Sequence, residues 1–360
     1  MKEHITIGMD LGNKKHKKHT VCALDAAGSI LFWRDVANKP KVLEEFFREH
    51  AGATVAMETG LCCRWISALA RAQGCRVLVG NARKLAPIWM SKRKNDRNDA
   101  QTIARLARAD SELFHPVELR DDEHHAMVQI IRLREQAVGT RTALVNSIRG
   151  TCKARGVFLP VCDASCFHKA ARDLLEGDLA QLVAPLLDLL EAVRESIRAY
   201  DRMLETYARE HFGKETDLLQ TIPGCGLITA CAFVAHVGDP ARFEKARSAG
   251  PNFGLTPAQD QSSEKDAPKR ISKTGSSQVR HLLMTAANYI LRDSSPDTAL
   301  KRHGLRICAR GGKVARRKAK VAVARKLAVT MLAMLKTGRP YEDRRAGKEP
   351  AAKAAESRVS

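Results

Sequence analysis

Ile5-Thr6-Ile7-Gly8-Met9-Asp10 is an apolar run that ends in a carboxylate. Thr54-Val55-Ala56-Met57-Glu58 repeats this arrangement further along the chain. Short apolar runs of this kind, bounded by turn residues, predict strands. Each strand would deliver an acidic residue to its own carboxyl end, and Thr59-Gly60 would form the turn before a helix that begins near Leu61.

A second acidic pair, Asp96 and Asp99, lies in Lys94-Asn95-Asp96-Arg97-Asn98-Asp99-Ala100. On a helix, a spacing of three residues places both on one face, with Cβ atoms about 5–6 Å apart. Magnesium prefers oxygen ligands and takes few protein carboxylates, leaving its other positions to water and phosphate. Any one of these carboxylates alone would more commonly be a solvated side chain. Their joint order predicts a metal site made by Asp10, Glu58, Asp96 and Asp99.

The surrounding segments alternate between strand and helix signals. Strands are expected at 5–10, 20–25, 30–36, 53–58 and 75–80, and helices at 40–50, 61–73 and 96–110. Such alternation is typical of a compact α/β domain. We therefore expect a domain of the RNase H or RuvC type over residues 1–115.

Five basic residues and one tryptophan fall between residues 81 and 94, immediately before Asp96. A charge run is more commonly a solvated face, but a basic approach to a metal site suits a phosphodiester. The candidates for nucleic-acid contact here are Arg83, Lys84, Lys92, Arg93 and Lys94.

Composition agrees with a polyanionic partner. Lys and Arg number 61 against 40 Asp and Glu, which gives a net charge of +21 and favours nucleic acid over a membrane. No apolar stretch approaches the roughly 18 residues of a membrane span, and no signal-peptide core begins the chain. We expect a cytoplasmic protein without membrane contact. Its ten cysteines form no Cys-x-x-Cys pair, so we expect reduced thiols rather than a zinc site.

Residues 116–215 carry few strand signals and predict a central helical region. Apolar residues recur there at alternating steps of three and four, the pattern of a coiled-coil seam: Leu175, Leu179, Leu182, Leu186, Leu189, Val193, Ile197, Tyr200, Leu204 and Tyr207. Pro185 interrupts the seam, so we expect the helix to start or kink there. The pattern fits an intramolecular helical hairpin and a dimerisation coil equally well.

Residues 216–340 predict a mainly helical C-terminal domain, followed by a disordered tail over 341–360. Ile222-Pro223-Gly224-Cys225-Gly226 is typical of a helix-hairpin-helix motif, in which glycine amides at a helix N-terminus can approach phosphate. Residues 301–326 contain eleven Lys or Arg and no acidic residue. The candidates for nucleic-acid contact in this domain are Gly224, Gly226, Lys273, Arg280, Arg316, Arg317, Lys318 and Lys320.

From about residue 5 to 340 the chain resembles the insertion sequence 110 transposases, also called DEDD transposases. The motifs that carry this resemblance are Gly8-Met9-Asp10, Met57-Glu58-Thr59-Gly60, Lys94-Asn95-Asp96-x-x-Asp99-Ala100, Ile222-Pro223-Gly224-x-Gly226, Gly254-Leu255-Thr256-Pro257 and Ile271-Ser272-Lys273-x-Gly275.

The resemblance implies a RuvC-like domain with a magnesium-binding tetrad, Asp10, Glu58, Asp96 and Asp99, which would hold two Mg²⁺ ions. It also implies a serine nucleophile in the C-terminal domain, which would be Ser262, with Ser263 as the alternative. The expected partners are donor DNA, target DNA, a structured bridge RNA that guides recombination, and further copies of the chain in a dimer or tetramer. The serine would attack a phosphate to give a 5′-phosphoserine linkage and a free 3′ hydroxyl, and the site would be composite.

Two other functions remain open from the sequence. One is a RuvC-like nuclease, such as a Holliday-junction resolvase, in which the metals activate water. The other is a non-catalytic, basic nucleic-acid-binding protein with structural carboxylates.

Overall fold

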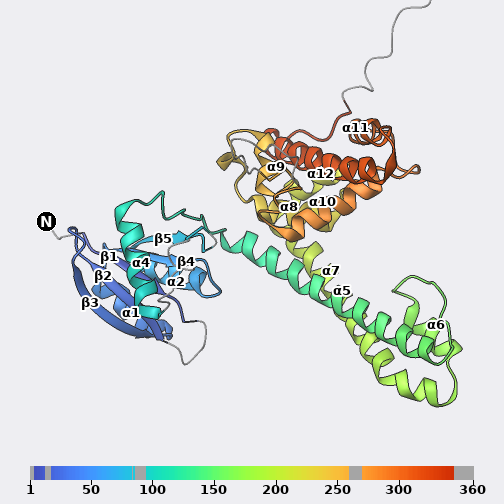
Figure 1. Cartoon of the computed structure of the whole chain (residues 1–360), viewed down its shortest axis with the longest axis horizontal. Coiled ribbons are helices and arrows are strands. Elements are labelled where there is room, and N and C mark those ends of the chain that lie inside the picture. Colours follow the sequence, from blue (N-terminus) through green and yellow to red (C-terminus); the bar gives the residue numbers. More distant parts are fainter. Residues whose placement is uncertain (1–3, 13–17, 83, 86–94, 259–269, 344–360) are drawn as a thin grey trace, which may run out of the picture. The chain divides into compact units, whose positions relative to one another are not determined.

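The computed structural model describes residues 4–12, 18–82, 84–85, 95–258 and 270–343. The chain divides into two compact units, Met1–Leu119 and Arg120–Ser360. The first is a mixed α/β unit and the second is helical (Figure 1). Ser262, Ser263, Arg83 and Lys92–Lys94 lie outside the described residues.

A five-stranded sheet forms the first unit. Its strands are β1 (Thr6–Asp10), β2 (Lys18–Leu24), β3 (Ile30–Ala37), β4 (Thr54–Glu58) and β5 (Arg76–Gly80). Their order is β3-β2-β1-β4-β5. β1, β2 and β3 pair antiparallel, whereas β4 and β5 run parallel to β1. The five expected strands are confirmed. The arrangement fits an RNase H-like domain, which a helical part follows in the sequence.

Helices cover both faces of this sheet. On one face, α1 (Pro40–Glu49) and α2 (Cys63–Ala72) bury a cluster that includes Met9 and Met57. On the other face, α4 (Asp96–Ala109) packs small side chains against Cys22 and Ala56. Alternate residues of one strand point to opposite faces, so the strand residues in these clusters show which way their neighbours along the strand point.

The helical unit begins with a long pair of helices, α5 (Asp122–Ala154) and α7 (Gly177–Gln220), which pack together within the chain. The short α6 (Phe167–Leu174) lies between them in sequence and joins their shared core. The expected helix start at Pro185 is wrong, because α7 begins at Gly177 and continues through Pro185. Pro185 and Gln181 are exposed, so water can satisfy the Gln181 carbonyl that loses its helical partner. The non-helical residue is Phe212 (φ −140°, ψ 27°).

The expected coiled-coil seam divides into two stripes. Leu179, Ile197 and Leu204 are buried, whereas Leu182 and Leu189 are 53% and 48% exposed. The buried stripe packs against α5 of the same chain. The buried stripe thus forms an intramolecular hairpin. Only the exposed stripe is left for a contact with a second copy of the chain.

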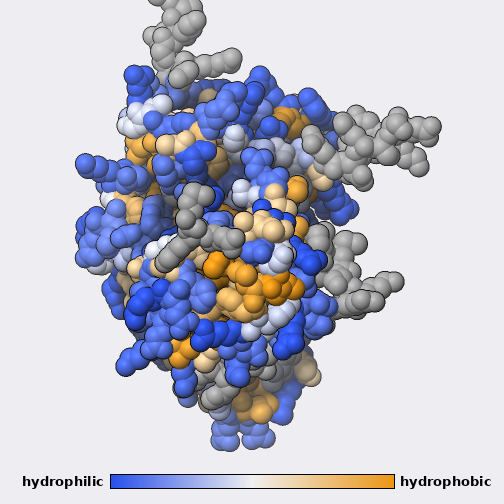
Figure 2. Space-filling model, turned by 90° about the vertical axis from the view of Figure 1, so that its left-hand side faces the viewer, coloured by the Kyte–Doolittle hydropathy of each residue, from blue (hydrophilic) through white to orange (hydrophobic). Residues whose placement is uncertain are grey.

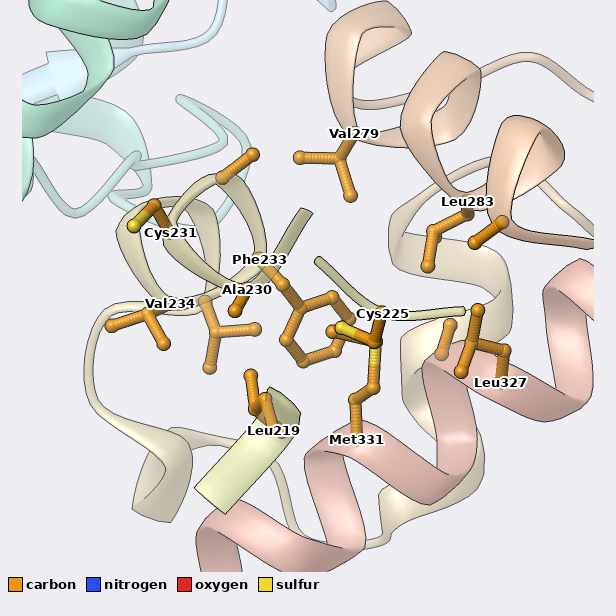
Figure 3. Packing of buried hydrophobic residues seen from close by; sticks show 14 of the residues in the cluster. Leu219, Cys225, Ala230, Cys231, Phe233, Val234, Val279, Leu283, Leu327 and Met331 are labelled. Carbon is orange, nitrogen blue, oxygen red and sulfur yellow. The ribbon is translucent and has the colours of Figure 1, made fainter. Parts of the chain in front are cut away.

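The rest of the unit is a helical bundle with two 3₁₀ turns, Pro240–Arg242 and Ala246–Ser248. Its helices are α8 (Leu227–Val237), α9 (Ala249–Asn252), α10 (Ser277–Ile290), α11 (Ala299–Cys308) and α12 (Gly312–Thr337). Figure 3 shows the Phe233 ring among side chains from these elements, with Cys225 and Leu219 beside it. Phe233 is fully buried, as expected for the apolar helix that follows Gly226.

The last described residues are attached to this bundle. The Tyr341 amide donates to Thr221 Oγ1 at 3.0 Å, and Asp343 forms an ion pair with Arg302 at 2.7 Å. The first residues of the expected tail at 341–360 therefore bind to the helical bundle. Residues beyond 343 lie outside the described part.

The surface and the thiols fit the composition. Figure 2 shows one face of the molecule, on which hydrophilic residues predominate. None of the helices in the described part of the chain is both long and apolar enough to cross a membrane. Each of the ten cysteines is a free thiol, and burial raises the pKa of the Cys225 and Cys231 thiols to about 12.

His236, on the last turn of α8, predicts a pH dependence of stability. It is 5% exposed, and burial is the main cause that lowers its pKa to about 4. The unfolded chain, with a pKa near 6.5, therefore binds this proton first as pH falls. The free energy of unfolding should fall by roughly 2–3 kcal/mol between pH 6.5 and pH 4, at about 1.4 kcal/mol per pKa unit.

In urea titrations, His236→Gln should lose most of that pH-dependent part, because glutamine has no proton to gain in this range. His281→Gln, at an exposed position on α10, is the matched control. Equal pH dependence in the wild type and His236→Gln would contradict the assignment.

Candidate active site

The carboxyl ends of β1 and β4 place two acidic residues side by side. The parallel register pairs Met9 with Met57, so Asp10 and Glu58 follow as the next residue of each strand. Neighbouring strands lie about 4.8 Å apart. Both carboxylates are half-buried.

These two side chains point to the face that α4 covers. Gly8 approaches α4 so closely that an added Cβ would overlap the Ala100 carbonyl and lie 2.8 Å from Ala104 Cβ. Ala56 belongs to a cluster with Ile103 of the same helix. Asp10 and Glu58 lie two residues after Gly8 and Ala56, so strand alternation assigns them to the same face.

The first turn of α4 supplies the other two carboxylates. Asn95 caps the helix, because its side chain accepts from the Asn98 amide at 2.7 Å. Carboxylates in a first turn interact favourably with the positive end of the helix dipole. Asp99 is 8% exposed and immediately precedes Ala100, the residue that touches Gly8, whereas Asp96 is exposed. We call the ends of β1 and β4, together with this turn, the carboxylate edge.

Two further residues, Thr20 and Asp35, extend this edge. Thr20 pairs with Asp10 in the antiparallel register, and Asp35 pairs with Thr20 on the next strand. Thr20 Oγ1 donates to Asp35 Oδ1 at 3.2 Å. Asp35 was not expected from the sequence, although the registers of the β1–β2 and β2–β3 pairs align it with Thr20 and Asp10.

The carboxylate edge brings oxygen ligands to one face of the sheet, but their side chains do not converge on a single point. Within the described ranges, no group of three or more His, Cys, Asp or Glu side chains is arranged to hold a metal ion. The donor type still fits a hard divalent cation, since carboxylate oxygens are the ligands that magnesium selects. Asp10, Glu58 and Asp99 each have an interaction partner in the structure.

The basic segment begins beside this edge. Gly80, the last residue of β5, pairs with Glu58. The Ala82 amide then donates to Thr59 Oγ1 at 3.3 Å, and the exposed Lys84 follows. Lys84 is the one candidate of this segment within the described residues.

In the helical unit, the two motif segments around the expected serine pair with each other. The Ser272 amide donates to the Thr256 carbonyl at 2.8 Å, and the Ala258 amide donates to the Arg270 carbonyl at 2.9 Å. Residues 254–258 and 270–274 thus form a two-stranded stem, which we call the serine stem because Ser262 lies between its strands in the sequence.

The helix-hairpin-helix candidate is the turn between α7 and α8. Gly224 has φ +92°, and an added Cβ would lie 2.7 Å from Tyr289 Cδ1. Gly226 is exposed at the N-cap of α8, with open space around it. Gly224 therefore serves close packing against α10, and Gly226 is the glycine that solvent and ligands can reach.

The remaining basic candidates differ in their surroundings. Arg316, Arg317 and Lys318 are exposed on the first half of α12, and Lys320 is half-buried. Lys273 is exposed with φ +56°. Arg280 donates hydrogen bonds to the carbonyls of Phe253 and Thr274.

Comparison with known proteins gives two matches to family models. A model described as a transposase, of the DEDD type of insertion sequence IS110, matches residues 7–154. A second model, described as a transposase of the IS116/IS110/IS902 family, matches residues 216–304.

Curated transposases resemble the chain over most of its length. The transposase for insertion sequence element IS1111A of Coxiella burnetii is 27% identical over 81% of this chain and 79% of its own length. The transposase for insertion sequence element IS1328 of Yersinia enterocolitica is 26% identical over 79% of this chain and 84% of its own length.

The close contact between β1 and α4 predicts that Gly8→Ala is destabilising. The added methyl group would overlap the backbone of α4, and overpacking of this kind costs typically about 1–3 kcal/mol. Gly60→Ala is the matched control in the same unit, because an added Cβ there meets nothing within 4 Å. Urea unfolding measures both, and equal stability of the two variants would argue against the close approach.

Proposed function

The chain belongs to the IS110 family of transposases, enzymes that cleave and join DNA, and from that premise we propose that it recombines DNA through a magnesium-bound acidic tetrad and a serine nucleophile. The observation that carries the proposal is the carboxylate edge. Three separate segments of the sequence bring Asp10, Glu58 and the first turn of α4 to one face of the sheet.

Asp10, Glu58, Asp96 and Asp99 would hold the metal, with two Mg²⁺ ions as the proposed complement. When bound, magnesium supplies Lewis-acid polarisation of a scissile phosphate. The exposed Asp96 would complete the ligand set from the solvent side, and the buried Asp99 would stay fixed by the packing of α4. Thr20 lies between Asp10 and Asp35 and would orient Asp35, so that Asp35 adds negative charge at the margin of the ligand set.

Ser262 would supply the nucleophile. A serine hydroxyl is weak at its free pKa and needs activation. In the proposed step the Ser262 oxygen bonds to phosphorus, the bond from phosphorus to the 3′ oxygen breaks, and the serine proton ends on the released 3′ hydroxyl. The 5′-phosphoserine linkage conserves the bond energy, so reversal on another DNA end rejoins the strands without ATP.

The nucleic acids would bind through basic surface residues. Lys84 extends from the carboxylate edge, and Arg316, Arg317, Lys318 and Lys320 line the first half of α12. The α8 N-terminus, which begins at the exposed Gly226, would suit a phosphate in the manner of a helix-hairpin-helix motif. The proposed ligands are donor DNA, target DNA and a structured bridge RNA.

Strand exchange between several DNA ends requires more than one copy of the chain, so we propose a dimer or tetramer. The exposed stripe of α7, which includes Leu182 and Leu189, is a candidate contact. The competing reading is a RuvC-like nuclease that uses metal-activated water. A covalent protein–DNA adduct distinguishes the two, because only the serine mechanism forms one.

The tetrad gives a direct test of the proposed chemistry. Asp10→Asn, Glu58→Gln and Asp99→Asn should each lower recombination in magnesium at least about 100-fold, because a lost ligand removes several kcal/mol of transition-state stabilisation. Binding of DNA should change little. Asp110→Asn, at the exposed C-cap of the same helix, is the control. Recombination by Asp99→Asn within a few-fold of the wild type would reject the tetrad.

RNA guidance predicts that the purified protein retains one discrete structured RNA. Its affinity should weaken steeply with salt, since Lys and Arg contacts release counterions from phosphates. Replacing four residues by alanine should reduce the slope of log K against log salt by at most about 0.7–0.9 for each lost contact: Arg316, Arg317, Lys318 and Lys320.

A matched variant removes the same charge from exposed positions around α1 and α2: Lys39, Lys41, Arg48 and Arg71. It should leave the slope near that of the wild type. Recovery of only random cellular RNA, together with recombination that survives nuclease treatment before DNA is added, would refute guidance and leave the metal and serine chemistry in place.

A further inference from the structure

The sheet holds the end of β1 only as far as Asp10. The antiparallel register with β2 ends with the pair of Asp10 and Thr20, and the parallel register with β4 ends one residue earlier, at Met9. Leu11 and Gly12 follow in backbone that belongs to no strand. The position of the Asp10 carboxylate therefore depends on what holds the chain immediately after it.

Side chains from two other elements hold that backbone at Gly12. The Gly12 amide donates to Nδ1 of His19 on β2 at 3.1 Å. Asn38, between β3 and α1, donates from Nδ2 to the Gly12 carbonyl at 3.3 Å. Both polar backbone groups of this glycine are thus bonded to side chains. His19 is fully buried, and hydrogen bonds in such surroundings are stronger than in water.

The protonation state of His19 suits this bond. A histidine nitrogen accepts an amide proton only in the neutral ring, which here carries its own proton on Nε2. Burial is the main cause that lowers the pKa of His19, so the ring is neutral at neutral pH. Removing the ring therefore takes no charge away from the carboxylate edge, and an effect on metal binding would come from geometry.

We infer that His19 is a positioning residue for the metal site, which holds Asp10 in place by fixing the Gly12 amide. The inference rests on the proposed function, because it concerns Asp10 as a magnesium ligand. Asp10 and Glu58 end adjacent strands, and their like charges repel each other, so the backbone beside Asp10 must resist their separation. A histidine that only filled the core would act differently, since replacing it would lower stability and leave the site of the folded protein unchanged.

The test uses the full-length protein with Mn²⁺ as the probe ion. Electron paramagnetic resonance measures the affinity, and urea titration shows that each variant is folded. His19→Leu fills the buried position without an acceptor and should weaken Mn²⁺ binding about 10- to 100-fold, the usual effect of removing a group that orients a metal ligand. His19→Asn should bind Mn²⁺ nearly as well as the wild type, because asparagine Oδ1 and histidine Nδ1 occupy the same place along the side chain.

His50→Leu is the matched control. His50 is half-buried near the opposite end of the sheet, where its carbonyl accepts from the Ala53 amide just before β4. Its Nδ1 bonds to the Phe46 carbonyl at 2.8 Å. This variant also loses a histidine hydrogen bond to the backbone, and it should keep the Mn²⁺ affinity of the wild type.

Hydrogen exchange gives a readout that needs no metal. In His19→Leu the Gly12 amide should exchange faster than in the wild type, while the amides of β4 keep their protection. Unchanged exchange at Gly12 would contradict the inference. If His19→Leu does not fold, Asn38→Ala removes the other bond to Gly12 and should weaken Mn²⁺ binding about tenfold. Wild-type affinity in that variant would then overturn the inference.

Asp10→Asn, measured in parallel, separates this inference from the proposed function. Weaker Mn²⁺ binding in Asp10→Asn, with wild-type affinity in His19→Leu, would overturn the positioning role alone. An equal loss in His19→Leu and His19→Asn, or a similar loss in His50→Leu, would assign the effect to packing and overturn that role as well. Equal binding by the wild type and Asp10→Asn would overturn Asp10 as a metal ligand, and the inference with it.

Discussion

The close approach of α4 to β1 at Gly8 is the contact on which the carboxylate edge depends. Because Gly8 has no side chain, the backbone of α4 at Ala100 lies directly on the strand. Asp99, one residue earlier, is thereby carried to the strand end where Asp10 lies. The Asn95 cap fixes where the helix begins. A larger residue at position 8 would push α4 away from β1. The carboxylates of α4 would then lie farther from those at the ends of β1 and β4.

The helical unit also contains close backbone crossings at glycines. Gly254 and Gly275 let the strands of the serine stem cross at its base, and Arg280 joins both strands to α10. In the first unit a packed core therefore supports the carboxylate edge, and in the second a packed core holds the base of the serine stem.

Sequence reasoning identified what is encoded locally. The strand that ends at Asp10 and the helix expected over 96–110 were both predicted, and the structure has β1 at Thr6–Asp10 and α4 at Asp96–Ala109. Sequence reasoning did not identify Asp35, which joins the edge only through the register of two strand pairs. The expected helix start at Pro185 is wrong, because a proline on an exposed helix face costs a hydrogen bond that water can replace. The packing of Gly224 against α10 depends on tertiary contacts that no local pattern encodes.

The measurement that tests this account most directly is binding of Mn²⁺, as a spectroscopic substitute for magnesium, to the full-length protein. Electron paramagnetic resonance titration should show Mn²⁺ bound by the wild type, with affinity at least about tenfold weaker in Asp10→Asn and in Asp99→Asn, since each removes a ligand. Both variants should keep wild-type unfolding curves. Equal Mn²⁺ affinity in the wild type and both variants would contradict the claim that packing of α4 on β1 builds the metal site.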